Sequence, residues 1–133
     1  MSNILEVKDL NVSYGGIKAV KEISFQVPKG QVVTLIGANG AGKSSTLRSI
    51  VGLVKPESGS IRFKDTELAG LSTDQIVSKG ITLVPEGRRV FPDLTVLENL
   101  KIGAYMRKDS LDEDLNWVHE LFPRLKERSW QLA

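Results

Sequence analysis

The chain has 133 residues, of which 41% are hydrophobic, and its 18 Lys and Arg residues exceed its 16 Asp and Glu residues to give a net charge of +2. This is the composition of one globular chain with a modest core, and the small basic excess does not indicate nucleic acid as a partner. The absence of cysteine excludes disulfides, thiolate catalysis and zinc–sulfur sites. No signal peptide and no apolar run of the roughly 18 residues that span a bilayer are recognisable, so we expect a cytosolic chain that reaches a membrane only through a partner.

Two alternating segments open the chain. Apolar residues occupy alternate positions in residues 5–14, which end at a Gly-Gly pair, and again in residues 23–27, which end at a Pro-Lys-Gly turn. Such alternation is typical of strands with one exposed face, and we expect an antiparallel layer beside a parallel core. Tyr14 ends the first segment, where its ring could pack in the layer or stack on a base; the spacing leaves both open.

Residues 37–44 read GANGAGKS and match the phosphate-loop pattern G-x-x-x-x-G-K-[ST]. The β-branched run Gln31–Ile36 before them predicts a buried strand, and the apolar spacing after Ser44 predicts a helix. Glycines allow the backbone to approach phosphates closely, and loop amides at a helix N-terminus attract anions. We expect Lys43 to reach the β- and γ-phosphates and the Ser44 hydroxyl to bind magnesium.

Beyond this helix, Ser60–Lys64 alternates and predicts a short strand. Ser72 and Gln75 form a capping box that opens a short helix, which Gly80 closes. The apolar run Ile81–Val84 predicts a second buried strand.

A charged turn, Pro85 to Arg89, follows that strand. Residues just past the carboxyl end of a strand face the ligand in open α/β folds. Glu86 could therefore orient a magnesium-bound water, and Arg88 or Arg89 could contact phosphates or a partner. A solvated turn without a ligand is the alternative.

The remaining chain is predicted to be helical. Thr95 and Glu98 form a second capping box, before a helix that runs to about Met106. The charged residues 108–114 indicate a linker.

An amphipathic helix is predicted after this linker, up to Pro123. His119 lies on it without a ligand-spaced partner, and we interpret it as a surface side chain. Trp117 and Trp130 could belong to a core or to an interface.

The stretch LNVSYGGIKAVKEISFQVPKGQVVTLIGANGAGKSSTLRSIVGLVKPESGSI resembles the ATP-binding subunits of ABC transporters, and VPEGRRVFPDLTVLENL is similar to their branched-chain amino-acid uptake branch. The resemblance extends from Leu5 to Ala133. It implies the N-terminal part of an α/β phosphate-loop NTPase, with parallel core strands, an adjoining antiparallel β layer and the start of a helical subdomain. The implied division places layer and core in residues 1–84, and a Q-loop-like segment with the start of the helical subdomain in residues 85–133.

The resemblance also implies a site with ATP and magnesium as cofactors. In the family an aromatic residue near the end of the first strand stacks on adenine, and Tyr14 matches it. Glu86 stands where the family usually has glutamine, and the branched-chain branch is similar in this departure. Lys43 and Glu86 are the implied catalytic residues, and Ser44 with Glu86 the implied magnesium ligands. The implied nucleotide-binding residues are Tyr14, Gly37, Asn39, Gly40, Ala41, Gly42, Lys43, Ser44 and Ser45.

The implied function is ATP hydrolysis coupled to uptake of branched-chain amino acids or similar small solutes. The implied partners are transmembrane permease subunits, a second ATP-binding subunit that is identical or different, and indirectly a periplasmic or extracellular solute-binding protein. The implied location of the subunit is the inner face of the cell membrane. There, a coupling helix of the transmembrane partner would bind to the surface around residues 88–100. A non-catalytic nucleotide-binding or assembly module is the alternative; a small phosphate-loop kinase would need an arginine-rich lid, which is not recognisable.

Parts of the family's catalytic machinery are not found in this sequence. It shows no LSGGQ-like signature, no apolar strand ending in paired acidic residues and no switch histidine. We therefore expect the N-terminal portion of a longer subunit, which binds nucleotide at best and hydrolyses little. The strands that flank the phosphate-loop strand would come later in such a subunit, so we expect an unpaired sheet edge, uncovered apolar surface and self-association.

Overall fold

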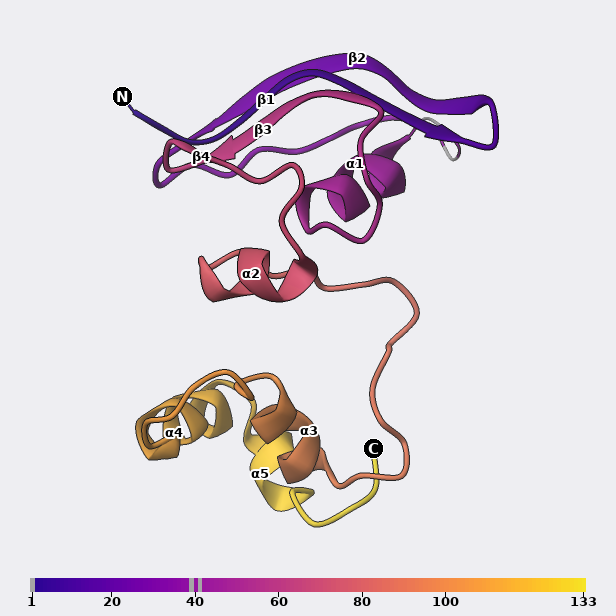
Figure 1. The fold of residues 1–133 in the computed structure, drawn as a ribbon. Helices are drawn as coiled ribbons and strands as arrows, with labels where there is room; N and C mark the ends of the chain where they lie inside the picture. The colour runs from indigo at the N-terminus through magenta and orange to yellow at the C-terminus, as the bar shows by residue number, and fades with distance from the viewer. Residues whose placement is uncertain (1, 39, 41) are drawn as a thin grey trace. The chain divides into compact units, whose positions relative to one another are not determined.

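The computed structural model describes residues 2–38, 40 and 42–133 of the chain (Figure 1). They form two compact units, Met1–Leu83 and Val84–Ala133. The first unit holds the strands β1 to β4 with helices α1 and α2, and the second holds helices α3 to α5. The predicted site residues Tyr14 to Ser45 lie in the first unit.

The sheet of the first unit has four strands in the order β2-β1-β3-β4, and every neighbouring pair is antiparallel. The strands are β1 (Asn3–Tyr14), β2 (Ile17–Pro28), β3 (Ser58–Phe63) and β4 (Thr66–Glu67). The predicted antiparallel layer is thus confirmed. Its first two strands are longer than the alternation indicated, since β1 begins at Asn3 and β2 begins directly after the tight turn at Gly15 and Gly16.

The core of the first unit lies between this sheet and helices α1 (Lys43–Ile50) and α2 (Thr73–Ser78). Leu10 and Val12 of β1 and Ile76 of α2 have no exposed surface, and Ile61 of β3 is 1% exposed. Fully burying each such side chain is worth about 1.5–3 kcal/mol. The core therefore fixes β1 against α1, which carries the phosphate loop at its N-terminus.

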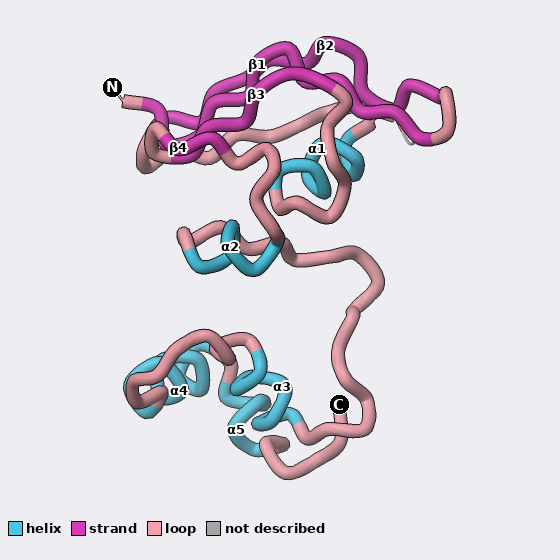
Figure 2. The backbone as a smooth tube through the Cα atoms, viewed as in Figure 1, coloured by secondary structure: helices cyan, strands magenta, loops and turns pink. Residues whose placement is uncertain are grey.

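The two predicted parallel strands are not formed. Residues 31–36 and 81–84 are drawn as loop in Figure 2, and neither segment belongs to the sheet. Val32, Ile36 and Val84 are more than 90% exposed. The prediction of buried strands at Gln31–Ile36 and Ile81–Val84 was wrong because an apolar pattern only makes a segment suitable for a sheet. A strand also needs a neighbour for its backbone hydrogen bonds, and the described residues supply none for these segments.

Both predicted capping boxes are confirmed. The Ser72 hydroxyl accepts from the Gln75 amide at 3.3 Å, and the Gln75 side chain accepts from the Ser72 amide at 2.9 Å. Thr95 and Glu98 do the same at the start of α3 (Val96–Ile102). Helix α3 ends before the predicted Met106, because Gly103 follows it and glycine is a poor helix former.

Helices α4 (Asp112–Leu121) and α5 (Pro123–Glu127) complete the second unit. The chain end returns to α3, where the Val96 amide donates to the Gln131 carbonyl at 2.8 Å. His119 is half-buried, and its Nε2 atom is shielded from solvent with no hydrogen-bond partner among the described residues, so its interpretation as a surface side chain was incomplete. Trp117 and Trp130 are exposed.

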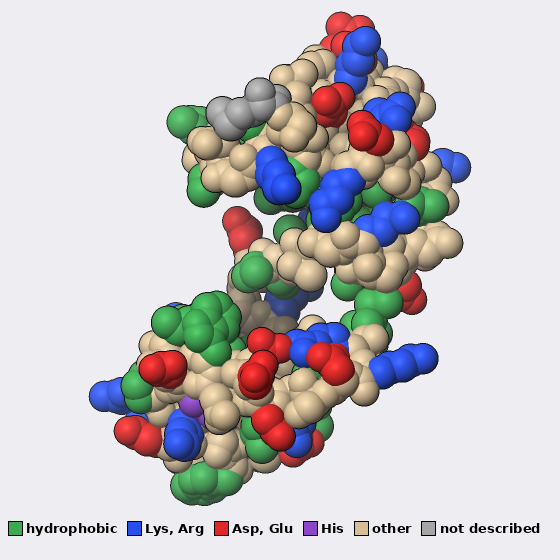
Figure 3. Space-filling view, turned by 90° about the vertical axis from the view of Figure 1, so that its left-hand side faces the viewer, with side chains coloured by type: hydrophobic (Ala, Val, Ile, Leu, Met, Phe, Trp, Pro, Cys, Tyr) green, Lys and Arg blue, Asp and Glu red, His purple; other side chains and the backbone are tan. Residues whose placement is uncertain are grey.

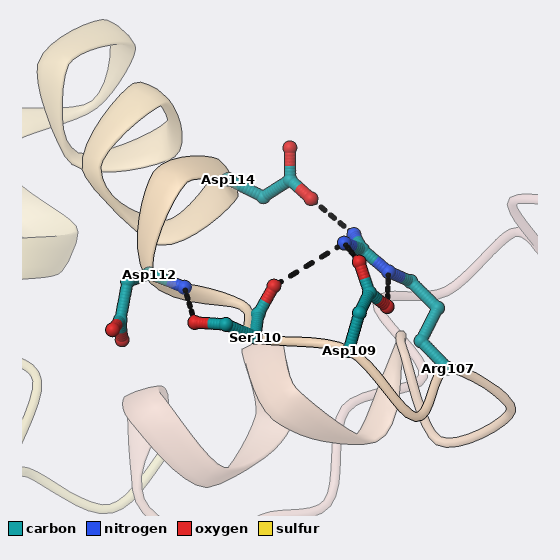
Figure 4. A network of polar contacts seen from close by, with 5 residues as sticks. All are labelled: Arg107, Asp109, Ser110, Asp112 and Asp114. Carbon is teal, nitrogen blue, oxygen red and sulfur yellow. Dashed lines mark hydrogen bonds and ion pairs between the residues drawn. The ribbon is translucent and has the colours of Figure 1, made fainter.

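A polar network lies in the loop between α3 and α4 (Figure 4). The Arg107 guanidinium donates to both oxygens of Asp109, at 3.0 and 2.6 Å, and also contacts the Asp114 carboxylate. This pairing holds the pKa of Arg107 above and the pKa of Asp109 below the ordinary values. The charge pairs therefore join the predicted linker to the first turn of helix α4, which begins inside it.

Large apolar side chains reach the surface of both units, and one face with such groups is seen in Figure 3. In the first unit they include Ile17, Val32, Ile36 and Leu53. None of the helices formed by the described residues has the length and apolar character of a membrane span.

Candidate nucleotide-binding site

The glycine-rich loop leads directly into helix α1. Gly42 is the N-cap of this helix with a φ of 94°, and Lys43 is its first residue. Gly42 accepts two hydrogen bonds at its carbonyl oxygen, from the amide of Thr46 at 2.9 Å and from its hydroxyl at 2.8 Å. Thr46 is 1% exposed. The buried threonine therefore fixes the first turn of α1. The backbone amides of this turn have no partner within the helix, so they can bind an anion.

A glycine is required at position 42. A Cβ atom there would lie 2.4 Å from the carbonyl oxygen of Ala19 and 3.2 Å from a methyl group of Val20. Strand β2 thus approaches the loop more closely than any side chain would allow, and the positive φ also favours glycine. At Gly40, φ is 87° and the space beside the residue is open, so only the backbone conformation calls for glycine there.

Lys43 folds back over the loop. Its half-buried side chain donates from Nζ to the carbonyl oxygen of Gly37 at 2.5 Å. An ammonium group carries three donors, so this contact leaves two of them for other acceptors. The contact holds a positive charge at the mouth of the loop, where a phosphate oxygen would meet both the ammonium and the α1 amides.

The structure brings Tyr14 to the same place. Tyr14 is the last residue of β1 and is 43% exposed. Its hydroxyl donates to the Ser45 Oγ in the first turn of α1, at 3.3 Å. An accessible aromatic ring therefore lies beside the phosphate loop, as stacking on a base requires.

Ser44 is exposed in the first turn of α1, next to Lys43. Magnesium prefers oxygen ligands and keeps several waters, so it binds to nucleotide sites through one or two protein oxygens together with phosphates. One accessible hydroxyl beside a lysine and free helix amides fits this chemistry. The residues present therefore suit a magnesium–triphosphate group.

A pocket of about 200 Å³ adjoins the loop. It is lined by Ile23, Leu35, Ile36, Gly42, Lys43 and Thr46. Its walls are mostly apolar, and the Thr46 hydroxyl is already bonded to Gly42. This hollow suits apolar packing and not a polyanion, so we place the candidate phosphate site on the open side of the loop, where Ser44 is exposed.

Glu86 belongs to the second unit, in a turn with positive φ at Gly87 and Arg88. It is exposed, and its carbonyl oxygen accepts from the Arg89 Nε at 3.3 Å. Its role at a metal remains a prediction. Asn39 and Ala41, both predicted to bind nucleotide, lie outside the described residues.

Two residues that position the loop were not found from the sequence. Thr46 was read only as part of a helix, although its hydroxyl caps the loop at Gly42. Ala19 was assigned no role, although its carbonyl limits position 42 to glycine. The G-K-S spacing indicates that a glycine is needed, but no sequence signal names the strand that presses against it.

The pattern G-x-x-x-x-G-K-[ST], in a loop that leads into the N-terminus of α1, is the signature of the class of phosphate-loop nucleotide-binding proteins. Within that class, the chain belongs to the ABC transporter family, because the family's model matches residues 20–131. The predicted family is thereby confirmed; of the predicted fold class, the antiparallel layer is present, whereas the described residues do not form the parallel core strands.

Individual relatives agree with this assignment. The chain is 49% identical, over 98% of its length and 56% of the relative's, to the high-affinity branched-chain amino acid transport ATP-binding protein BraG of Pseudomonas aeruginosa. It is 37% identical, over 79% of its length and 38% of the relative's, to the petrobactin import ATP-binding protein FpuD of Bacillus anthracis.

Among solved structures, the chain is similar to an ATP-binding subunit of an ABC transporter with a TM-score of 0.82. The two are 32% identical, and the similarity covers 97% of this chain and 54% of that one. The chain thus spans 38–56% of the length of these three proteins.

Proposed function

We propose that this chain is the nucleotide-binding part of an ATP-binding subunit of an ABC importer, and that the importer takes up branched-chain amino acids or similar small solutes. The observation that carries the proposal is the loop geometry, in which Lys43 closes the loop on Gly37 at the N-terminus of α1. The solute class is supported by the similarity to BraG. The similarity to FpuD, whose name gives a different cargo, is why related small solutes are included.

Each residue of the site has a distinct role in this proposal. Tyr14 stacks on adenine, and Lys43 neutralises charge on the β- and γ-phosphates as the terminal phosphoryl group leaves. Ser44 supplies an oxygen ligand to magnesium; a role of Glu86 at that ion or its water stays a prediction from the resemblance. ATP, when bound, supplies the phosphoryl group whose transfer to water drives transport, and magnesium offsets its charge.

The proposed partners follow from an importer subunit. They are transmembrane permease subunits, a second ATP-binding subunit, and indirectly a solute-binding protein outside the membrane; the subunit lies on the inner face of the membrane. We place the permease contact around residues 88–100. Within this segment, the Asn99 side chain of α3 holds the loop that precedes the helix. It accepts from the Phe91 amide at 2.8 Å and donates to the Thr95 carbonyl at 2.9 Å. Val90 and Phe91 are each 53% exposed and available to a partner.

The chain by itself is proposed to bind nucleotide with little hydrolysis. It spans about half the length of its relatives. The groups proposed here for the phosphates are few, and phosphoryl transfer depends on many positioned donors around the transition state. A non-catalytic nucleotide-binding module is therefore the second candidate, favoured by the same limited set of groups.

Calorimetric titration with Mg-ATP tests the proposal, with Lys43→Ala as the variant and Lys29→Ala as the control. Lys29 is an exposed lysine in the turn after β2 and changes the net charge equally. Saturable binding that is lost in Lys43→Ala and kept in Lys29→Ala is the expected result. Absence of binding by the unaltered chain, or equal binding by both variants, would contradict it.

Phosphate release, measured on the same three proteins, separates the two candidates. We expect no release above background from the chain alone. Turnover that disappears in Lys43→Ala would show that the chain is itself an ATPase and would exclude the non-catalytic module.

A further inference from the structure

The hydroxyl of Tyr14 has a contact that stacking on a base does not require. It donates to the Ser45 Oγ at 3.3 Å, and so joins the end of β1 to the first turn of α1. A phenylalanine ring would offer the same face to a base. The hydroxyl therefore needs its own explanation.

The end of the hairpin that follows Tyr14 is exposed. Gly15 and Gly16 follow it in the turn, and the space beside both glycines is open. Ile17, the residue paired with Tyr14 across the hairpin, is 74% exposed. The bond to Ser45 therefore joins an exposed end of the hairpin to the first turn of α1.

The hydrogen-bonding capacity of Ser45 allows this bond to persist when phosphate is bound. A serine hydroxyl has one donor and two acceptor positions. Ser45 accepts from Tyr14, and no other described residue takes up its hydrogen, which can therefore be donated to a phosphate oxygen. One serine can thus hold the ring and a phosphate at the same time.

We propose that the Tyr14 hydroxyl is a positioning group, which acts through Ser45 to hold the aromatic ring at a set place beside the phosphate loop. The base and phosphate subsites are then arranged relative to each other before the nucleotide enters. Holding a group in its bound conformation raises affinity by lowering the cost of ordering it. This inference rests on the proposed nucleotide-binding function.

Tyr14→Phe is the test, with Tyr105→Phe as the matched control in the second unit. Affinities are measured by calorimetry for Mg-ATP and for magnesium tripolyphosphate, which lacks the base. The bond is longer than most hydroxyl–hydroxyl bonds, so its loss should weaken ATP binding by about threefold, the lower end for a hydrogen bond. Tripolyphosphate binding should stay unchanged, because that probe does not use the ring. Tyr105→Phe should change neither.

A double-mutant cycle with Ser45→Ala tests the route of the effect. Ser45→Ala should weaken both probes, since it also removes a phosphate donor. Adding Tyr14→Phe to Ser45→Ala should then cause no further loss of ATP affinity.

Three results would overturn the inference while the proposed function stands: unchanged ATP affinity in Tyr14→Phe, equal weakening of both probes, or additive effects of the two substitutions. Failure of the unaltered chain to bind either probe would overturn the proposed function, and this inference with it.

Discussion

Gly42→Ala is the substitution whose effect follows most directly from the structure. Gly42 is the N-cap of α1 with a φ of 94°, and an added Cβ would meet the Ala19 carbonyl oxygen at 2.4 Å. Two costs add up here. An L-residue in the left-handed region costs about 1–2 kcal/mol, and relieving an overpacked contact with backbone costs about 1–3 kcal/mol more.

The expected loss of stability in the first unit is therefore about 2–5 kcal/mol. Gly80→Ala is the matched control: its φ is 106°, but the space beside it is open. It should cost only about 1–2 kcal/mol, from the backbone conformation. The difference between the two variants measures the close approach of β2 to the loop.

Hydrogen exchange of the β1 and β2 amides is the appropriate assay, because both tryptophans lie in the second unit and their fluorescence would report on that unit. If these amides exchange through opening of the first unit, Gly42→Ala should accelerate exchange by about 30-fold or more, since 1.4 kcal/mol corresponds to tenfold. Gly80→Ala should accelerate it by about 5- to 30-fold. Equal acceleration in the two variants would refute the argument that β2 restricts position 42.

Two further predictions concern the charges and the exposed apolar surface. The hydrogen bond from Arg107 lowers the pKa of Asp109, so the pair stabilises the second unit above the ordinary aspartate pKa, and this contribution disappears as the pH falls through the lowered value. NMR titration should find the Asp109 pKa raised toward its ordinary value in Arg107→Gln; an identical titration in both proteins would contradict this. Because Val32, Ile36 and Val84 are exposed, sedimentation should show self-association that grows with concentration, whereas a compact monomer at high concentration would argue against it.

Much of the local structure could be predicted from the sequence alone. The alternation before Tyr14 predicted β1, the Ser72 and Thr95 capping boxes predicted two helix starts, and the GANGAGKS pattern predicted the loop that caps α1. These features depend on contacts between residues that are close in sequence. Their physical causes are side-chain alternation, helix capping and glycine conformation.

Only the tertiary structure decided which segments pair and which side chains meet. The apolar runs at 31–36 and 81–84 looked like buried strands, but a strand forms only where another backbone supplies its hydrogen bonds. Likewise, no local pattern places the Tyr14 hydroxyl on Ser45 or the Ala19 carbonyl against Gly42. Such contacts depend on how β1, β2 and α1 pack around a common core, and that packing is a property of the whole unit.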